Sequence, residues 1–360
     1  MPGLHLILQK GCAFVNLESL YAQVKETISG LDLNSIWPGF EVLKFALYDD
    51  AACYFDGKYI EKTDDFCANT SISFHGEQIA IWMVDGEMDI PVLASKIVHE
   101  MFHGYQTLMG WTCWPDEMEA LYRYTYSTEN LSLKLRENAL LLGLMDRFDD
   151  LAFQELLAHR KLRSMQFPWE FLYESRVEEI EGTANYVEWQ VLRQLDAEIA
   201  GRLEDSMRAS ITTPGSLFPI RISSYFTGAL MIHAMRSAGI YHFGPEDRPV
   251  MTGLLERVQP SGGDFPGKAD IARKTAGAVA AFQEETESII RSALACNELV
   301  LSGPCDLVGV NIYDARCLRG FITSTYFLMV RKGQEDTVLR GNFVIRMQDD
   351  KTVEAVYRWT

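Results

Sequence analysis

Short apolar runs separated by turn residues fill the first part of the chain, residues 1–88. The stretch FEVLKFALYDDAACYFDGKYI holds two such runs, and Asp56–Gly57 is a typical two-residue hairpin turn. A further run, QIAIWMV at 78–84, is rich in strand-forming residues and lies between His75–Gly76 and Asp85–Gly86. The pattern predicts a β-rich region, and the opening MPGLHLILQKGCAFVNLESL predicts a first strand or helix without the features of a signal peptide.

From Asp89 onward the apolar positions repeat with the period of a helix. Asp89 suits an N-cap and Pro91 suits the first turn, where its missing N–H costs nothing. Gly110 suits the position that follows a helix, because glycine adopts the left-handed conformation readily. We therefore expect a helix from Ile90 to Met109.

The helical period continues to about residue 295. In ENLSLKLRENALLLGLM it places Leu131, Leu135, Ala139 and Leu142 on one stripe. The stretches DDLAFQELLAHRKLRSM and WEFLYESRVEEIEGTANYVEWQVLRQL follow the same period. The segment QPSGGDFPG, residues 259–267, predicts a loop before a last helix near 276–295.

Strand-like patterns return from Leu299, and TVLRGNFVIRM and KTVEAVYRW predict a terminal hairpin. The chain is therefore predicted to have an α+β fold in three parts. These are an N-terminal β-rich lobe at 1–88, a helical lobe at 89–295 and a small C-terminal β domain at 296–360. The 360 residues are ample for cores in more than one domain.

The composition of the chain argues against some kinds of binding partner. The net charge of −17 without a basic stripe argues against nucleic acid. No apolar run approaches the roughly 20 residues that a membrane helix needs, so no membrane partner is expected. The seven cysteines are scattered, odd in number and without CxxC spacing, which is typical of reduced thiols in a cytoplasmic protein. The oligomeric state does not follow from the sequence.

The predicted helix at 90–109 carries the motif HEMFH at residues 99–103. Residues four apart share one helix face, so His99 and His103 can direct two imidazoles at one ion. Glu100 points elsewhere and is placed to take a proton from a water held by that ion. The motif therefore predicts one zinc ion bound by His99 and His103, although an ordinary helix with two structural histidines has the same letters.

Zinc at a catalytic site needs a third protein ligand. The segment YESRVEEIEGTANYVE offers Glu174, Glu178 and Glu181 on one helical face, a pattern that a solvated acidic stripe also produces. Gly182 and Ala184 are small, as two closely approaching helices require, and Asn185 lies one turn after Glu181, where its side chain can bond a ligand histidine. We predict Glu181 as the ligand, with Glu178 as the alternative.

At these residues the chain resembles the gluzincins, the HExxH-plus-glutamate peptidases that include thermolysin and the zinc aminopeptidases. The segment IEGTANYVE, residues 180–188, is similar to the aminopeptidase word NEGFAxYxE, with Ile180 and Thr183 as departures. The family's third ligand falls on Glu181. The separation of His103 and Glu181 is longer than in that branch and implies inserted helices. The resemblance also implies that QIAIWMV is the edge strand beside the active site, along which a bound peptide runs.

The resemblance also extends to a group that stabilises the oxyanion. SSYFTGALMIHAM, residues 223–235, is similar to the family word YxKGAxV, with Thr227 in place of lysine. It implies that the Tyr225 hydroxyl donates a hydrogen bond to the tetrahedral intermediate. His233 and His242 are alternatives, because thermolysin-like enzymes use a histidine.

Taken together, the motifs predict a zinc-dependent metallopeptidase that acts on a peptide or protein substrate. Its metal ligands are His99, His103 and Glu181, and its catalytic residues are Glu100 and Tyr225. The GAMEN word with which the aminopeptidases grip a free amine is missing, so the motifs leave exo- and endopeptidase action open. The alternative is a binding or regulatory protein, catalytically inactive or not a peptidase, on a gluzincin scaffold. His₂Glu sites also accept divalent ions other than zinc.

Overall fold

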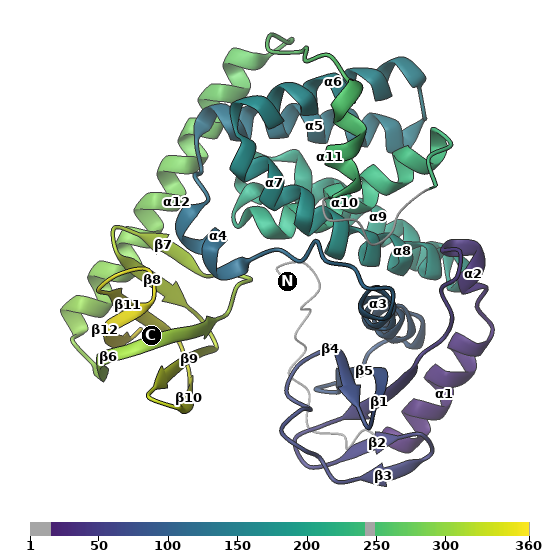
Figure 1. The fold of residues 1–360 in the computed structure, drawn as a ribbon, viewed down its shortest axis with the longest axis vertical. Coiled ribbons are helices and arrows are strands. Elements are labelled where there is room, and N and C mark those ends of the chain that lie inside the picture. Colours follow the sequence, from purple (N-terminus) through teal and green to yellow (C-terminus); the bar gives the residue numbers. More distant parts are fainter. Residues whose placement is uncertain (1–15, 242–248, 360) are drawn as a thin grey trace.

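The computed structural model describes residues 16–241 and 249–359 and shows a mixed α+β fold, as predicted. Figure 1 shows a small sheet formed by β1 to β5, a large helical region, and a second sheet formed by β6 to β12. The two sheets lie apart from each other and each adjoins the helical region. Among the described residues, no helix has the length and apolar composition to span a membrane.

Within the described part of the chain, the N-terminal sheet has five strands in the order β3-β2-β1-β5-β4. Strands β1 and β5 pair in parallel, and the other pairs are antiparallel. The strands are β1 (Lys44–Tyr48), β2 (Cys53–Phe55), β3 (Lys58–Ile60), β4 (Thr70–Phe74) and β5 (Glu77–Met83). The stretch 78–84 is thus a strand, but the prediction that it forms the sheet edge is wrong. Strand β4 covers β5 and is itself the edge.

Two helices precede this sheet, α1 (Leu17–Ser29) and α2 (Leu33–Ile36), within the region 1–88 that was predicted to be β-rich and to open with a strand or a helix. Helix α1 begins after Asn16, whose side chain accepts a hydrogen bond from the Ser19 N–H at 3.0 Å. Its buried residues Leu17, Tyr21, Val24 and Ile28 recur at helical spacing.

Two tight turns join neighbouring strands of the sheet. The predicted Asp56–Gly57 turn connects β2 to β3, with φ of 48° and 84°. His75–Gly76 connects β4 to β5 in the same way, with φ of 51° and 84°. Positive φ at both turn residues belongs to the hairpin turn whose twist matches that of the strands. The hairpin turn predicted at Asp56–Gly57 is confirmed.

Helix α3 (Ile90–Leu108) is the predicted histidine-bearing helix and ends one residue earlier than expected. Asp89 is its N-cap without a side-chain hydrogen bond, and Gly110 has φ of +73°. The helix packs on β4 and β5 with its other side against α8. Gly104 makes the approach to the sheet possible, because a Cβ there would lie 2.6 Å from the Leu43 side chain and 2.8 Å from Ser71 Oγ.

The helical region supplies the rest of the candidate site. Its elements are α4 (Glu117–Arg123), α5 (Thr128–Asp146), α6 (Asp150–Gln166), α7 (Pro168–Val177), the π-helical turn η1 (Glu178–Gly182), α8 (Thr183–Leu195), α9 (Ala197–Thr212), the short 3₁₀ turn η2 (Pro214–Leu217), α10 (Ile220–Ser237), α11 (Val250–Leu254) and the 3₁₀ turn η3 (Leu255–Arg257). Helix α5 packs against α6, α9, α10 and α12, so its buried residues are not confined to one stripe. Ala139, which was predicted to lie on a buried stripe, is exposed, and the prediction is wrong at this residue.

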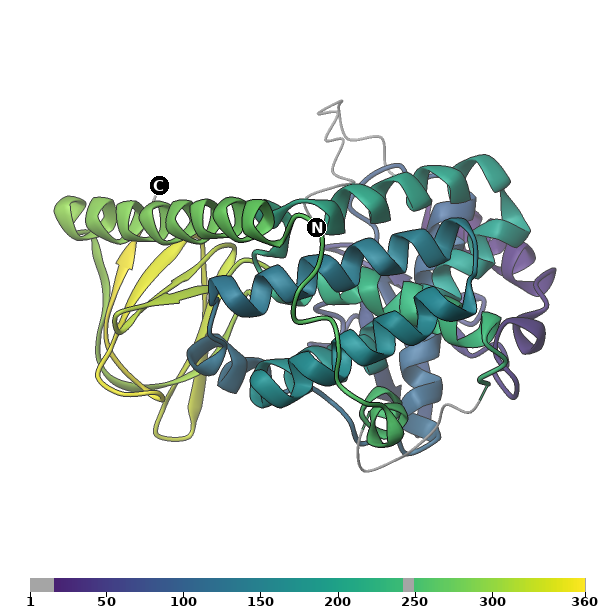
Figure 2. The same ribbon diagram turned by 90° about the horizontal axis from the view of Figure 1, so that it is seen from above.

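The C-terminal sheet is antiparallel, with the order β10-β9-β6-β12-β11-β8-β7. Its strands are β6 (Leu299–Val310), β7 (Arg316–Leu318), β8 (Phe321–Ser324), β9 (Phe327–Lys332), β10 (Glu335–Arg340), β11 (Phe343–Met347) and β12 (Thr352–Arg358). Strands β11 and β12 form the predicted terminal hairpin. Helix α12 (Lys268–Cys296) starts eight residues before its predicted start at 276 and lies along this sheet, packing Ile290 and Ala293 on it (Figure 2).

Candidate metal centre

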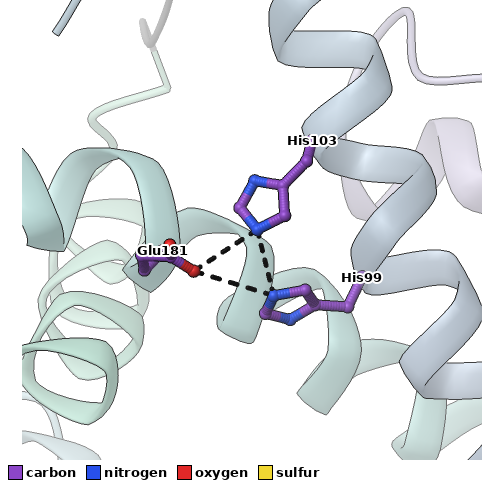
Figure 3. Close-up of side chains that lie close together, drawn as sticks. All are labelled: His99, His103 and Glu181. Carbon is purple, nitrogen blue, oxygen red and sulfur yellow. Dashed lines mark hydrogen bonds and ion pairs between the residues drawn. The ribbon is translucent and has the colours of Figure 1, made fainter. Parts of the chain in front are cut away.

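Three side chains from two helices converge where the sequence predicted a metal site. His99 and His103 lie one turn apart on α3, and Glu181 faces them from η1 (Figure 3). The two Nε2 atoms are 3.1 Å apart, and Glu181 Oε2 lies 3.3 Å from His103 Nε2 and 3.9 Å from His99 Nε2. Ligands about 2.0–2.1 Å from a tetrahedral zinc ion are roughly 3.3 Å from one another. The three atoms therefore fit one such ion.

Helix α7, the turn η1 and helix α8 follow one another and carry the three glutamates of the sequence prediction. Two of them face the helical core, and one faces the histidines. The middle element is the π-helical turn η1, in which each residue turns the chain by less than in an α-helix. Glu181 is thereby rotated away from the face that holds Glu174 and Glu178. Those two carboxylates point into the helical core, which leaves Glu181 as the member of the three that faces the histidines.

A buried ion cluster holds these two other carboxylates. Lys134 Nζ lies 3.0 Å from both Glu174 Oε2 and Glu178 Oε1. Glu178 also accepts hydrogen bonds from Arg160 at 3.2 Å and from Thr227 at 2.8 Å. The cluster has three cations and three carboxylates, each at most 4% exposed: Lys134, Arg160, Arg163, Glu137, Glu174 and Glu178. The alternative of Glu178 as a metal ligand is therefore wrong, because its oxygens are taken up in the core.

Each candidate histidine ligand has an acceptor beside its other ring nitrogen. Glu188 Oε2 lies 3.1 Å from His99 Nδ1, and the other oxygen of Glu188 lies 2.7 Å from Lys96 Nζ. Gln106 Oε1 lies 2.7 Å from His103 Nδ1. When an ion is bound, acceptors at these positions favour the proton on Nδ1 and leave Nε2 to the ion.

The identity of these two acceptors differs from the prediction, which assigned this role to Asn185. On helix α8, Glu188 rather than Asn185 faces α3. The amide of Gln106 is itself held, since its nitrogen donates to the Ile180 carbonyl and to Thr183 Oγ1, both at 2.9 Å. Gln106 lies three residues after His103, so helical spacing alone was enough to suggest it.

Arg221 is a site residue that the sequence reasoning missed. Its Nη2 donates to Glu181 Oε1 at 2.8 Å and to the Tyr225 hydroxyl at 2.8 Å, and its Nη1 pairs with Glu117. Arg221 precedes Tyr225 by one turn of α10, so the two project from the same face. The guanidinium thus holds the oxygen of Glu181 that does not face the histidines.

Two glycines bring α10 close to Glu181. A Cβ on Gly182 would lie 2.4 Å from Gly228 Cα, and one on Gly228 would lie 2.7 Å from the Glu178 carbonyl oxygen. Gly182 does mark a close helix approach, as expected. The partner is α10, which carries Tyr225, rather than α3, which carries the histidines.

Tyr225 lies next to Glu181. Burial and the Glu181 carboxylate raise the pKa of Tyr225 well above its usual value, so the phenol keeps its proton. Tyr313, from the connection between β6 and β7, is hydrogen-bonded to Tyr225 and was not predicted at the site. The alternative His233 packs against Trp189, with ring centroids 5.2 Å apart. The other alternative, His242, lies outside the described residues.

Burial raises the pKa of Glu100 above its usual value, although both histidines oppose this effect. Burial alone would lower the pKa of His103, but Glu181 and Glu100 raise it to about 9. Burial alone would raise the pKa of Glu188, but Lys96 and His99 lower it to about 2. The carboxylates around His103 thus favour a positive charge on its imidazole.

The fixed charges around the three atoms favour a divalent cation. Leaving the histidines aside, the contacts among the described residues bring four carboxylates and two cations to the site: Glu100, Glu117, Glu181, Glu188, Lys96 and Arg221. Two negative charges are therefore in excess in a largely buried place, where unpaired charge is costly. A dication at the histidines would balance them.

Comparison of the chain with known protein families, with curated proteins and with solved structures finds no match. The functional argument for this protein therefore rests on the chemistry of the site.

Proposed function

We propose that the protein is a zinc-dependent metallopeptidase that hydrolyses peptide bonds. One observation carries the proposal. Two imidazole Nε2 atoms and a carboxylate oxygen, 3.1–3.9 Å apart, converge beside a glutamate that immediately follows the first histidine. His99, His103 and Glu181 would hold the ion. When bound, zinc supplies a Lewis acid that polarises a carbonyl and lowers the pKa of a water.

The other residues of the site perform proton transfer and charge stabilisation. Glu100 accepts the proton of the attacking water and passes it to the leaving amine, roles for which a raised carboxylate pKa is suited. Tyr225, protonated throughout, donates a hydrogen bond to the oxyanion as charge develops on it. Arg221 holds Glu181 and the Tyr225 hydroxyl in one arrangement.

A peptide substrate also needs a surface along which to extend. Strand β4 (Thr70–Phe74) is the edge of the N-terminal sheet and packs beside α3, which carries the histidines. An extended peptide can pair with such an edge through main-chain hydrogen bonds. In this proposal β4 takes the part that the resemblance gave to residues 78–84.

Metal content of the purified protein, measured by mass spectrometry, tests the ligand set. We expect about one zinc per chain, lost in His103→Ala and in Glu181→Ala. Cleavage of a mixed peptide library by the zinc-loaded protein then tests the reaction. Glu100→Gln should keep the metal and lose turnover, since the amide cannot take the proton.

The outcomes separate the two parts of the proposal. Zinc retained in Glu181→Ala would remove Glu181 from the ligand set. Normal turnover in Glu100→Gln would remove Glu100 from the mechanism. Stoichiometric zinc without cleavage of any peptide would favour a binding protein that uses the same metal site.

A further inference from the structure

A cavity of about 100 Å³ lies where the helical region meets the C-terminal sheet. We name it the junction pocket. Its walls come from α4, the α4–α5 connection, α7, the start of α10, α12, the β6–β7 connection and the start of β7. Five of the fifteen lining residues are aromatic, namely Tyr122, Tyr124, Tyr126, Tyr173 and Phe282. A cavity that holds one water needs only about 10–15 Å³, so this space is of the size of a large side chain.

The junction pocket adjoins the candidate metal centre through a shared wall. Arg221 and Glu117 both line the pocket, and they pair with each other. The same Arg221 guanidinium donates to Glu181 Oε1 at 2.8 Å. Ile312, another lining residue, precedes Tyr313, which is hydrogen-bonded to Tyr225. Arg221 and the segment that carries Ile312 and Tyr313 thus link the pocket to the candidate metal centre.

The walls present ring surfaces, because most of their hydroxyl groups already have partners. The Tyr124 hydroxyl donates to Glu174 at 2.6 Å, and that of Tyr173 donates to Glu117 at 2.8 Å. The Tyr126 hydroxyl accepts the Ile220 N–H at 3.3 Å. Stacked and edge-on ring contacts favour an aromatic occupant beyond the area that it buries.

We propose that the junction pocket is the specificity pocket of the protein, and that it takes an aromatic side chain next to the scissile bond. This inference rests on the proposed peptidase function. It gives the C-terminal β domain a direct part in substrate selection, since Ile312, Ala315 and Cys317 form one wall.

Peptide binding tests the pocket without turnover. Glu100→Gln serves as the uncleaving background, and calorimetry compares blocked alanine hexapeptides with and without a single central tyrosine or phenylalanine. We expect the tyrosine peptide to bind tighter than the alanine peptide by about tenfold or more. In the same background, Ala315→Phe fills the pocket and should bring this ratio close to one. Val338→Phe, on the exposed strand β10, is the matched control and should leave the ratio unchanged.

A second variant guards against misfolding of Ala315→Phe. Phe282→Ala enlarges the pocket and removes a ring from its wall, so it should weaken tyrosine and phenylalanine binding while alanine binding stays. Equal binding of the aromatic and alanine peptides, or a ratio that neither variant changes, would overturn the pocket assignment.

Cleavage by the zinc-loaded wild-type protein separates the two proposals. Equal kcat/KM for the tyrosine and alanine peptides would overturn the pocket and leave the peptidase in place. Pocket-dependent binding of the tyrosine peptide without cleavage would overturn the peptidase and leave an aromatic-binding site. Neither binding nor cleavage would overturn both.

Discussion

Glu178 and Glu181 lie three residues apart on one helix, and replacing each with glutamine is expected to affect a different property of the protein. Glu178 lies in the buried ion cluster, and Glu181 faces the histidines. Glutamine has the shape of glutamate and no charge, so the pair isolates the role of each carboxylate. Glu178→Gln should lower stability and keep zinc. Glu181→Gln should lose zinc with a much smaller effect on the metal-free fold.

The magnitude follows from the contacts of Glu178. Its carboxylate is 4% exposed and accepts hydrogen bonds from Lys134, Arg160 and Thr227. Removing its charge leaves three buried cations facing two carboxylates. Breaking a buried ion pair by removing one partner typically costs about 3–5 kcal/mol. We expect a loss of that size in the free energy of unfolding.

Replacing Glu181 is expected to cost less stability than replacing Glu178. Glu181 is 14% exposed in its side chain and borders an excess of negative charge, which its replacement reduces. A change to an outer partner of a metal ligand costs about 10–100-fold in metal affinity, so the loss of a ligand should exceed that range.

The assay has two readings on the same samples. Chemical denaturation of the metal-free proteins gives the free energy of unfolding, and competition with a zinc chelator gives the zinc affinity. If Glu178→Gln lost zinc at wild-type stability, or Glu181→Gln bound zinc normally, the separation of these two carboxylates by the π-helical turn would be refuted.

Three further predictions follow from the same contacts. Glu188→Gln should weaken zinc binding by about 10–100-fold at unchanged stoichiometry, measured by chelator competition; an unchanged affinity would show that His99 does not need this acceptor. The paired cations of the core hold the pKa values of Glu174 and Glu178 below 4.5 despite burial, so the folded chain binds fewer protons than the unfolded one at acid pH. The free energy of unfolding should therefore hold above about pH 4.5 and fall as the pH is lowered below it, and a flat profile would contradict this. Gly228→Ala should cost about 1–3 kcal/mol, because its Cβ would lie 2.7 Å from backbone atoms, whereas Gly277→Ala, with open space around it, should stabilise α12 by about 0.5–1 kcal/mol in the same denaturation assay.

Some features of the fold and of the candidate site follow from short stretches of sequence alone. Asp89, Pro91 and Gly110 mark the ends of α3 by rules that act within a few residues. Once that helix forms, His99 and His103 lie on one face whatever else the chain does. The hairpin turn at Asp56–Gly57 was readable for the same reason, since its positive φ values are a property of two residues.

The residues of a strand do not by themselves show whether the strand lies inside a sheet or at its edge. The run at 78–84 reads as a strand from its own residues, but whether another strand covers it depends on how the sheet is ordered. The hairpin at His75–Gly76 places β4 on its outer side and makes β4 the edge. Likewise the exposure of Ala139 depended on which helices surround α5.

The amino-acid sequence by itself determined the α+β class, the histidine helix and Glu181 as the predicted third ligand. Tertiary structure alone decided what surrounds them, because the partners come from distant parts of the chain. Because of the π-helical turn, Glu178 contacts Lys134 while Glu181 faces the histidines. The contact of two glycines brings Arg221 against Glu181, and the C-terminal sheet adds Tyr313. Such contacts depend on the packing of whole helices, which no local pattern of residues encodes.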